Sequence, residues 1–80
     1  MKKINENDFL DHFKNQFEDE NLKLDLNTKF RDLEGWDSMT SMMVISMLDE
    51  EYDCIISSEE MNNFNFVGDF LNFIKNHNDQ

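Results

Sequence analysis

The chain has 80 residues, which is enough for one domain and too few for two, and its 18 acidic against 7 basic residues give a net charge of −11. Such a surface repels nucleic-acid phosphates and favours partners that present Lys or Arg patches, so the composition argues against nucleic acid as a partner. The N-terminal segment turns polar and acidic by Asp8, and no window approaches the ~20 apolar residues of a membrane span. We therefore expect no signal peptide, no membrane span and a cytoplasmic location.

Helical spacing of apolar residues predicts a first helix from about Glu6 to Asp19. Its apolar face is formed by residues near i, i+4 and i+8 spacing, namely Phe9, Leu10, Phe13 and Phe17. Asn5 is a favourable N-cap residue, and Ile4 before it has the spacing to pack on Phe9 as a hydrophobic staple.

A long connection follows, from Asn21 to Trp36. Its apolar residues are expected to plug the core, and they are Leu24, Leu26, Phe30 and Leu33. Between them, Asn27, Asp32 and Gly35 supply turn chemistry.

A second helix is predicted to start at Asp37-Ser38, with Asp37 as its cap, and to continue to about Tyr52. On a helical wheel one arc is expected to be buried, formed by Val44, Ile45, Leu48 and Tyr52. Three methionines fall on the opposite side and should be partly exposed, namely Met39, Met42 and Met43.

Two further helices follow. Ser57 and Ser58 precede Glu59-Glu60-Met61, a capping signal for a short third helix, and a last helix should run from Phe66 to about Lys75. Its inward face is predicted to hold Val67, Phe70, Leu71 and Ile74. The predicted fold is therefore all-α, a small four-helix bundle with a long loop between the first two helices and a short third helix, forming one domain over residues 1–80.

The titratable residues do not favour catalysis or metal binding. His12, His77 and Cys54 lie far apart in sequence, whereas a nucleophilic triad needs its groups to converge in a pocket. The acids around Asp49 to Asp53 lack the glycine and spacing of a calcium loop, so we expect no metal site. We interpret both histidines as solvated surface residues and Cys54, the only cysteine, as a small hydrophobic residue that fills space.

One dipeptide has a chemical interpretation. A serine in the first turn of a helix, as Ser38 is expected to be, presents an outward hydroxyl in a local field that favours an incoming phosphate. Asp37-Ser38 alone is a common pair, however, and its simpler interpretation is that Ser38 helps to cap the helix.

The residues around this pair add specificity. Upstream the chain reads Phe30-Arg31-Asp32-Leu33-Glu34-Gly35-Trp36, and the second helix opens with Asp37-Ser38-Met39. Downstream the pattern continues through Leu48, Asp49-Glu50-Glu51-Tyr52, Ile56, Glu59-Glu60, Phe64, Val67 and Phe70-Leu71-Asn72-Phe73-Ile74. In this register nearly the whole chain resembles the acyl carrier protein family, which includes peptidyl and D-alanyl carrier domains.

The resemblance implies a carrier that is not an enzyme. A phosphopantetheinyl transferase would attach 4'-phosphopantetheine to Ser38, next to the motif residue Asp37, and the arm would hold acyl groups as thioesters. Partners would be an acyl- or aminoacyl-loading ligase and acyl-transfer enzymes, of fatty acid or polyketide biosynthesis, and the carrier would be a monomer. Two alternatives stay open: a specialised aminoacyl or peptidyl carrier loaded by an adenylating ligase, and an unmodified acidic adaptor.

Three departures from the family pattern bear on partner recognition. The stretch from Met39 to Met43 has no charge, where carriers of primary fatty-acid synthesis usually place acids. Met39, Met42 and Met43 would then form an apolar docking surface, or would pack against neighbouring loops. The usually small residue before the motif is Trp36, which would pin the loop to the core or contact the arm. A frequent proline after the second helix is replaced by Ser57.

Overall fold

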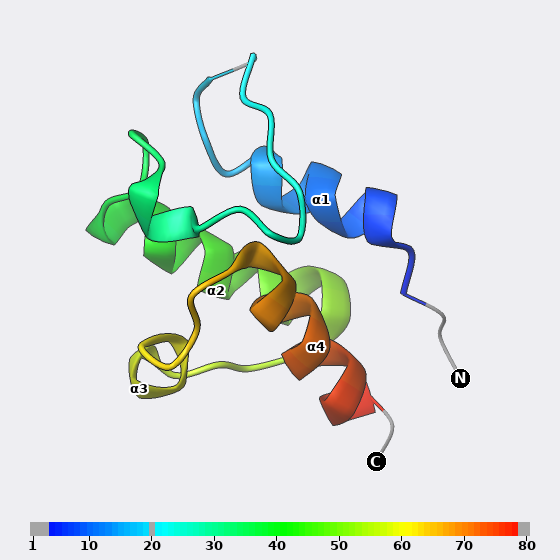
Figure 1. Ribbon diagram of the computed structural model, residues 1–80. Helices are drawn as coiled ribbons and strands as arrows, with labels where there is room; N and C mark the ends of the chain where they lie inside the picture. Colours follow the sequence, from blue (N-terminus) through cyan, green and yellow to red (C-terminus); the bar gives the residue numbers. More distant parts are fainter. Residues whose placement is uncertain (1–3, 20, 79–80) are drawn as a thin grey trace.

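The computed structural model describes residues 4–19 and 21–78 and confirms the all-α prediction. Residues 1–3, where the polar N-terminal segment begins, lie outside the described part of the chain. Within it the α-helices are α1 (Glu6–Lys14), α2 (Ser38–Tyr52), α3 (Ser58–Met61) and α4 (Val67–Asn78). A short 3₁₀ helix (Phe30–Asp32) interrupts the long α1–α2 loop, which in Figure 1 extends beyond α1 before it returns to the start of α2.

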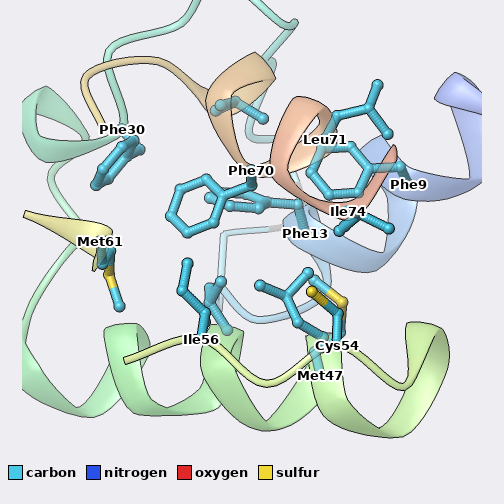
Figure 2. Packing of buried hydrophobic residues seen from close by; sticks show 13 residues of the cluster. Phe9, Phe13, Phe30, Met47, Cys54, Ile56, Met61, Phe70, Leu71 and Ile74 are labelled. Carbon is cyan, nitrogen blue, oxygen red and sulfur yellow. The ribbon is translucent and has the colours of Figure 1, made fainter. Parts of the chain in front are cut away.

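The core lies between α1, α2 and α4. Its fully buried centre is Phe70 of α4, whose ring centroid lies 5.3 Å from that of Phe13 on α1 and 4.9 Å from that of Phe30 in the loop. Figure 2 shows Phe13 and Phe70 pointing into the space between the helices, with Met47 on α2 across from them. Each fully buried ring contributes on the order of 1.5–3 kcal/mol through its removal from water, so these aromatic contacts dominate the packing.

The start of α1 is confirmed and its predicted end is wrong. Asn5 caps the helix, and its Oδ1 accepts hydrogen bonds from the backbone N–H groups of Asn7 (2.8 Å) and Asp8 (3.1 Å). The helix ends at Lys14 instead of Asp19.

The cause is a tightening of the chain after Lys14. The N–H of Gln16 donates to the carbonyl of Phe13 at 3.2 Å, and the N–H of Phe17 donates to the carbonyl of Lys14 at 3.0 Å. Both bonds reach back three residues, as in a 3₁₀ helix, instead of the four of an α-helix. The Gln16 side chain also donates to the His12 carbonyl at 2.8 Å and satisfies part of the helix end. Phe17 therefore packs on the core from outside the helix.

The buried face of α2 differs in part from the predicted arc. Val44 and Leu48 are fully buried, as predicted, whereas Ile45 and Tyr52 are only half-buried. Thr40 and Met47 are buried instead. Residues three and four positions from Val44 share its face of the helix, so the buried stripe is centred on Val44 and leaves Ile45 and Tyr52 at its edge.

The short helix has the predicted cap. Ser57 and Glu60 form a capping box, in which the Ser57 hydroxyl accepts from the Glu60 N–H at 3.1 Å and the Glu60 carboxylate accepts from the Ser57 N–H at 3.1 Å.

The last helix is displaced from its predicted bounds. It begins at Val67 because Phe66 is extended and pairs with Lys29 in an isolated antiparallel bridge. The Asp69 carboxylate accepts from the Phe66 N–H at 2.9 Å and so fixes this start. The helix ends at Asn78 instead of Lys75, while its inward face is buried as predicted, at Val67, Phe70, Leu71 and Ile74.

The long loop is fastened to the α3–α4 junction by the side chain of Arg31. Its guanidinium donates to the carbonyl oxygens of Phe64 and Met61, the latter at 2.9 Å, and lies 4.7 Å from the centroid of the Phe30 ring. These contacts hold the 3₁₀ helix, and with it the approach to α2, against the second half of the chain.

A backbone hydrogen bond also joins the long loop to the start of α4. The Gly68 N–H donates to the Leu26 carbonyl at 2.8 Å, and a Cβ at Gly68 would lie only 2.9 Å from that same oxygen. Glycine is therefore required here by the close approach of the two backbones.

Candidate functional site

Ser38 is the first residue of α2 and is exposed to solvent. Asp37 before it is extended, and its carboxylate accepts a hydrogen bond from the Thr40 N–H at 2.8 Å, as predicted for the cap. This bond is the main cause that lowers the pKa of Asp37 below its ordinary value, so the cap is ionised at neutral pH. The cap thus fixes the turn on which Ser38 is presented.

The first turn of α2 suits a phosphate ester on this serine. It contains no acidic residue, and the positive end of the helix dipole lies there. The next two hydroxyl-bearing residues along the helix already use their hydroxyls, because Thr40 donates to the Gly35 carbonyl at 2.9 Å and Ser41 donates to the Ser38 carbonyl at 2.8 Å. In the described part of the chain no hydrogen bond involves the Ser38 hydroxyl, which leaves it available for modification.

Trp36, two residues before Ser38, is half-buried in the aromatic cluster. Its ring lies parallel to that of Phe13, at 3° and 6.4 Å between centroids, and edge-on to that of Phe30 at 4.7 Å. Of the two predicted roles for this residue, these contacts support pinning of the loop to the core.

Three methionines of α2 are exposed, as predicted. Met39 is 72% exposed, Met42 68% and Met43 41%, and we call these three residues the Met patch. They do not pack away under neighbouring loops. They line one side of an open groove of about 590 Å³ between α1 and α2, with Met47 at its floor and His12 and Gln16 on the α1 side.

A family comparison addresses the chemistry of this site. The family model described as a phosphopantetheine attachment site matches residues 7–74, which is most of the chain, from Asn7 in α1 to Ile74 in α4. The chain belongs to this carrier family. No curated protein and no solved structure matches it.

Family membership defines the general role. The domain is a non-catalytic carrier of covalent 4'-phosphopantetheine. Its partners are a phosphopantetheinyl transferase and loading enzymes. An exposed serine at the start of a capped helix, with no acid in the first turn, fits a phosphate-linked arm. Among the described residues, none of the carrier's helices is long and apolar enough to cross a membrane.

The other reactive side chains of the carrier do not converge. Cys54 is fully buried, as predicted for a space-filling residue, and burial raises the pKa of its thiol. His77 is exposed near the end of α4. Within residues 4–19 and 21–78 no group of three or more His, Cys, Asp or Glu side chains is arranged to hold a metal ion.

His12 is a partly exposed surface residue that lines the groove, and it has neighbours that its sequence position does not predict. Its Nε2 lies 3.7 Å from a Glu51 carboxylate oxygen, and its ring lies edge-on to that of Tyr52 at 5.9 Å between centroids. It therefore belongs to the wall of the groove.

Tyr52, which lies against the His12 ring, has a hydroxyl whose pKa is raised. Burial is the main cause of this rise, and the charge of Asp8 is the second.

Two features of the site were missed from the sequence. The groove needs α1 and the turn after it beside α2, and no local pattern in this segment shows that His12 and Gln16 line a groove with the methionines. The buried Thr40 and its bond to Gly35 were also missed, although a threonine three positions after an N-cap aspartate is placed to return to the preceding loop.

Proposed function

We propose that Ser38 carries the phosphopantetheine arm and that this chain transports acyl groups as thioesters between partner enzymes. The single observation that supports Ser38 is its place as the exposed first residue of α2, immediately after the ionised cap Asp37. In the transfer, the Ser38 hydroxyl attacks phosphorus of the coenzyme A pyrophosphate. The nucleotide bisphosphate leaves, and the serine proton passes to the transferase.

The carrier's own contribution is presentation. A tethered thioester has an effective concentration in the millimolar range, on the order of 1 mM or more, at any enzyme within reach of the arm. The Asp37 cap and the pinned Trp36 hold the attachment point in one geometry, so that each partner meets the arm in the same orientation. The high negative charge favours partners with basic surfaces around their tunnels.

We further propose that the Met patch and the Trp36 loop form the recognition surface. The methionines are uncharged and adaptable, and their exposure beside Ser38 places them where a partner must approach. Acids return only at Asp49, Glu50 and Glu51 in the last turns of α2. A cognate partner would therefore pair an apolar contact near the active-site entrance with basic residues farther along the helix.

The second candidate concerns the cargo. The same uncharged first half of α2 favours a specialised aminoacyl or peptidyl carrier, loaded by an adenylating ligase, over a carrier of primary fatty-acid synthesis. In either case we expect the chain to act as a monomer, since each function needs one arm and one docking surface.

Labelling with a transferase and a fluorescent coenzyme A tests the attachment site. Ser38→Ala should abolish the label, whereas Ser41→Ala, three residues along the same helix, should keep it. The fold of Ser38→Ala should persist, because an exposed first-turn hydroxyl contributes at most ~1 kcal/mol of capping. A labelled Ser38→Ala protein would show that the site is wrong, and a wild-type chain that takes no label would favour the unmodified adaptor.

A loading assay separates the two cargoes. The holo protein is offered to fatty acyl and aminoacyl adenylating ligases in parallel, and the thioester is detected by its release with hydroxylamine. Loading by the first class only supports the acyl carrier, and loading by the second class only supports the aminoacyl or peptidyl carrier.

A further inference from the structure

We infer that the groove between α1 and α2 is a resting site for the carrier's own phosphopantetheine arm. This inference rests on the proposed attachment to Ser38. The groove begins at Met39, the residue after the attachment point, and its volume of about 590 Å³ lies in the range of small-molecule sites.

The direction and length of the groove match those of the arm. In steps of four residues along α2, Ser38 is followed by Met42, Ser46 and Glu50. Met42, Ser46 and Glu50 all line the groove. Residues at this spacing are neighbours on successive turns, so the row leads from the attachment point along the groove. At 1.5 Å per residue it spans about 18 Å. The arm has the covalent length of about five residues of extended chain, or about 17 Å.

The lining also matches the chemistry of the arm, which beyond its phosphate is neutral and alternates methyl-bearing carbons with a hydroxyl and two amides. The Met patch and Met47 supply polarisable apolar contacts. Ser46 and the amide oxygen of Gln16 supply polar ones, and the Gln16 amide is held by its own bond to the His12 carbonyl at 2.8 Å. The phosphate stays at the start of α2, a groove's length away from Glu50 and Glu51.

Tethering makes even a weak site effective. An arm fixed at Ser38 meets the groove at an effective concentration in the millimolar range. An intrinsic dissociation constant of about 1 mM, equivalent to about 4.1 kcal/mol, then keeps the arm docked about half of the time. Because the same methionines are proposed to contact partner enzymes, docking of a partner would displace the arm from the groove and release it toward the partner.

Methyl signals of the methionines test this site directly. The protein is labelled with ¹³C-methyl methionine, and spectra of the apo form and of the transferase-modified form are compared, after intact mass has shown complete modification. We expect the Met42 and Met43 methyl resonances to shift, while that of Met61, which is buried in α3, stays in place. Full modification at Ser38 with unchanged Met42 and Met43 signals would overturn the resting site and leave the attachment site intact. A chain that gains no mass would overturn both.

A spin label on the thiol of the arm provides the second readout. It should broaden the backbone amide signals of Ser46 and Glu50 in the wild-type protein. Met42→Glu should lower the equilibrium constant for docking about three- to tenfold, which corresponds to about 0.7–1.4 kcal/mol. Ile55→Glu is the matched control, because Ile55 is 76% exposed and lies outside the groove, and it should leave the broadening unchanged.

A third variant covers the case in which the transferase rejects Met42→Glu. Gln16→Ala removes a polar group from the opposite wall without altering α2, and it should also reduce the broadening. Broadening that is equal in Ile55→Glu, Gln16→Ala and wild type would show that the arm does not rest in this groove.

Discussion

Replacement of Arg31 by methionine should destabilise the carrier by about 2 kcal/mol, although Arg31 is exposed and lies outside every α-helix. Arg31→Met keeps the apolar stem and removes two hydrogen bonds, to the carbonyls of Met61 and Phe64, and the contact with the Phe30 ring. The bond to Met61 is partly buried and has a charged donor, which gives it about 1.5 kcal/mol. The bond to Phe64 is exposed, and together with the contact to the ring it contributes about 0.5 kcal/mol more.

Urea denaturation followed by circular dichroism measures this loss. For a domain of this size about 2 kcal/mol also lowers the melting temperature by about 10 °C. Lys29→Met is the matched control, since it removes the same charge two residues away, where the chain contributes a backbone bridge to Phe66. Its effect should stay within about 0.5 kcal/mol. If Arg31→Met costs no more than Lys29→Met, the loop is not held by this side chain, and the assignment of Arg31 is wrong.

Four further predictions concern the α2 methionines, the net charge and the Asp37 cap. Met43→Glu should cost about 1 kcal/mol of stability, because Met43 is 41% exposed. Met47→Glu should cost more than about 3 kcal/mol, because Met47 is only 5% exposed. Chemical denaturation of the two variants compares these losses. In a loading assay Met43→Glu should weaken docking of the cognate enzyme by about 1–2 kcal/mol, and an unchanged rate would place docking elsewhere. The melting temperature should rise from low to physiological salt, since screening relieves the repulsion of the −11 charge; a salt-independent value would contradict this. The pKa of Asp37 is lowered in the folded state, so its ionised cap stabilises the fold above the unfolded pKa of about 3.9, and this contribution is lost as the pH falls through the folded value. The stability advantage of wild type over Asp37→Asn, measured by urea titration, should therefore be present at neutral pH and vanish in acid, and a pH-independent difference would refute it.

The sequence was sufficient for features with local causes. The Asn5, Asp37 and Ser57 caps each depend on a side chain that bonds to a backbone group two or three residues away, and all three were predictable. The exposure of the Met patch followed from helical spacing in the same way.

Features with long-range causes were not predictable. The end of α1 depends on a tightened turn that allows Phe17 to reach Trp36, and apolar spacing alone extended the helix past that turn. The start of α4 depends on the bridge between Phe66 and Lys29, 37 positions apart in the numbering of the chain. The groove has the same character, because one of its walls belongs to α1 and the other to α2. The candidate attachment residue could thus be proposed from the Asp37-Ser38 motif, while the surface around it needed the packed helices.

Intact mass after co-expression with a phosphopantetheinyl transferase tests the central assignment most directly. The wild-type chain should gain a single increment of about 340 Da, the mass of one phosphopantetheine arm less water. Peptide mapping should place that increment on the fragment that contains Ser38, and Ser38→Ala should show none. A wild-type chain that gains no mass, or an increment that maps to Ser41 or Ser46, would contradict the assignment of Ser38 as the residue that carries the arm.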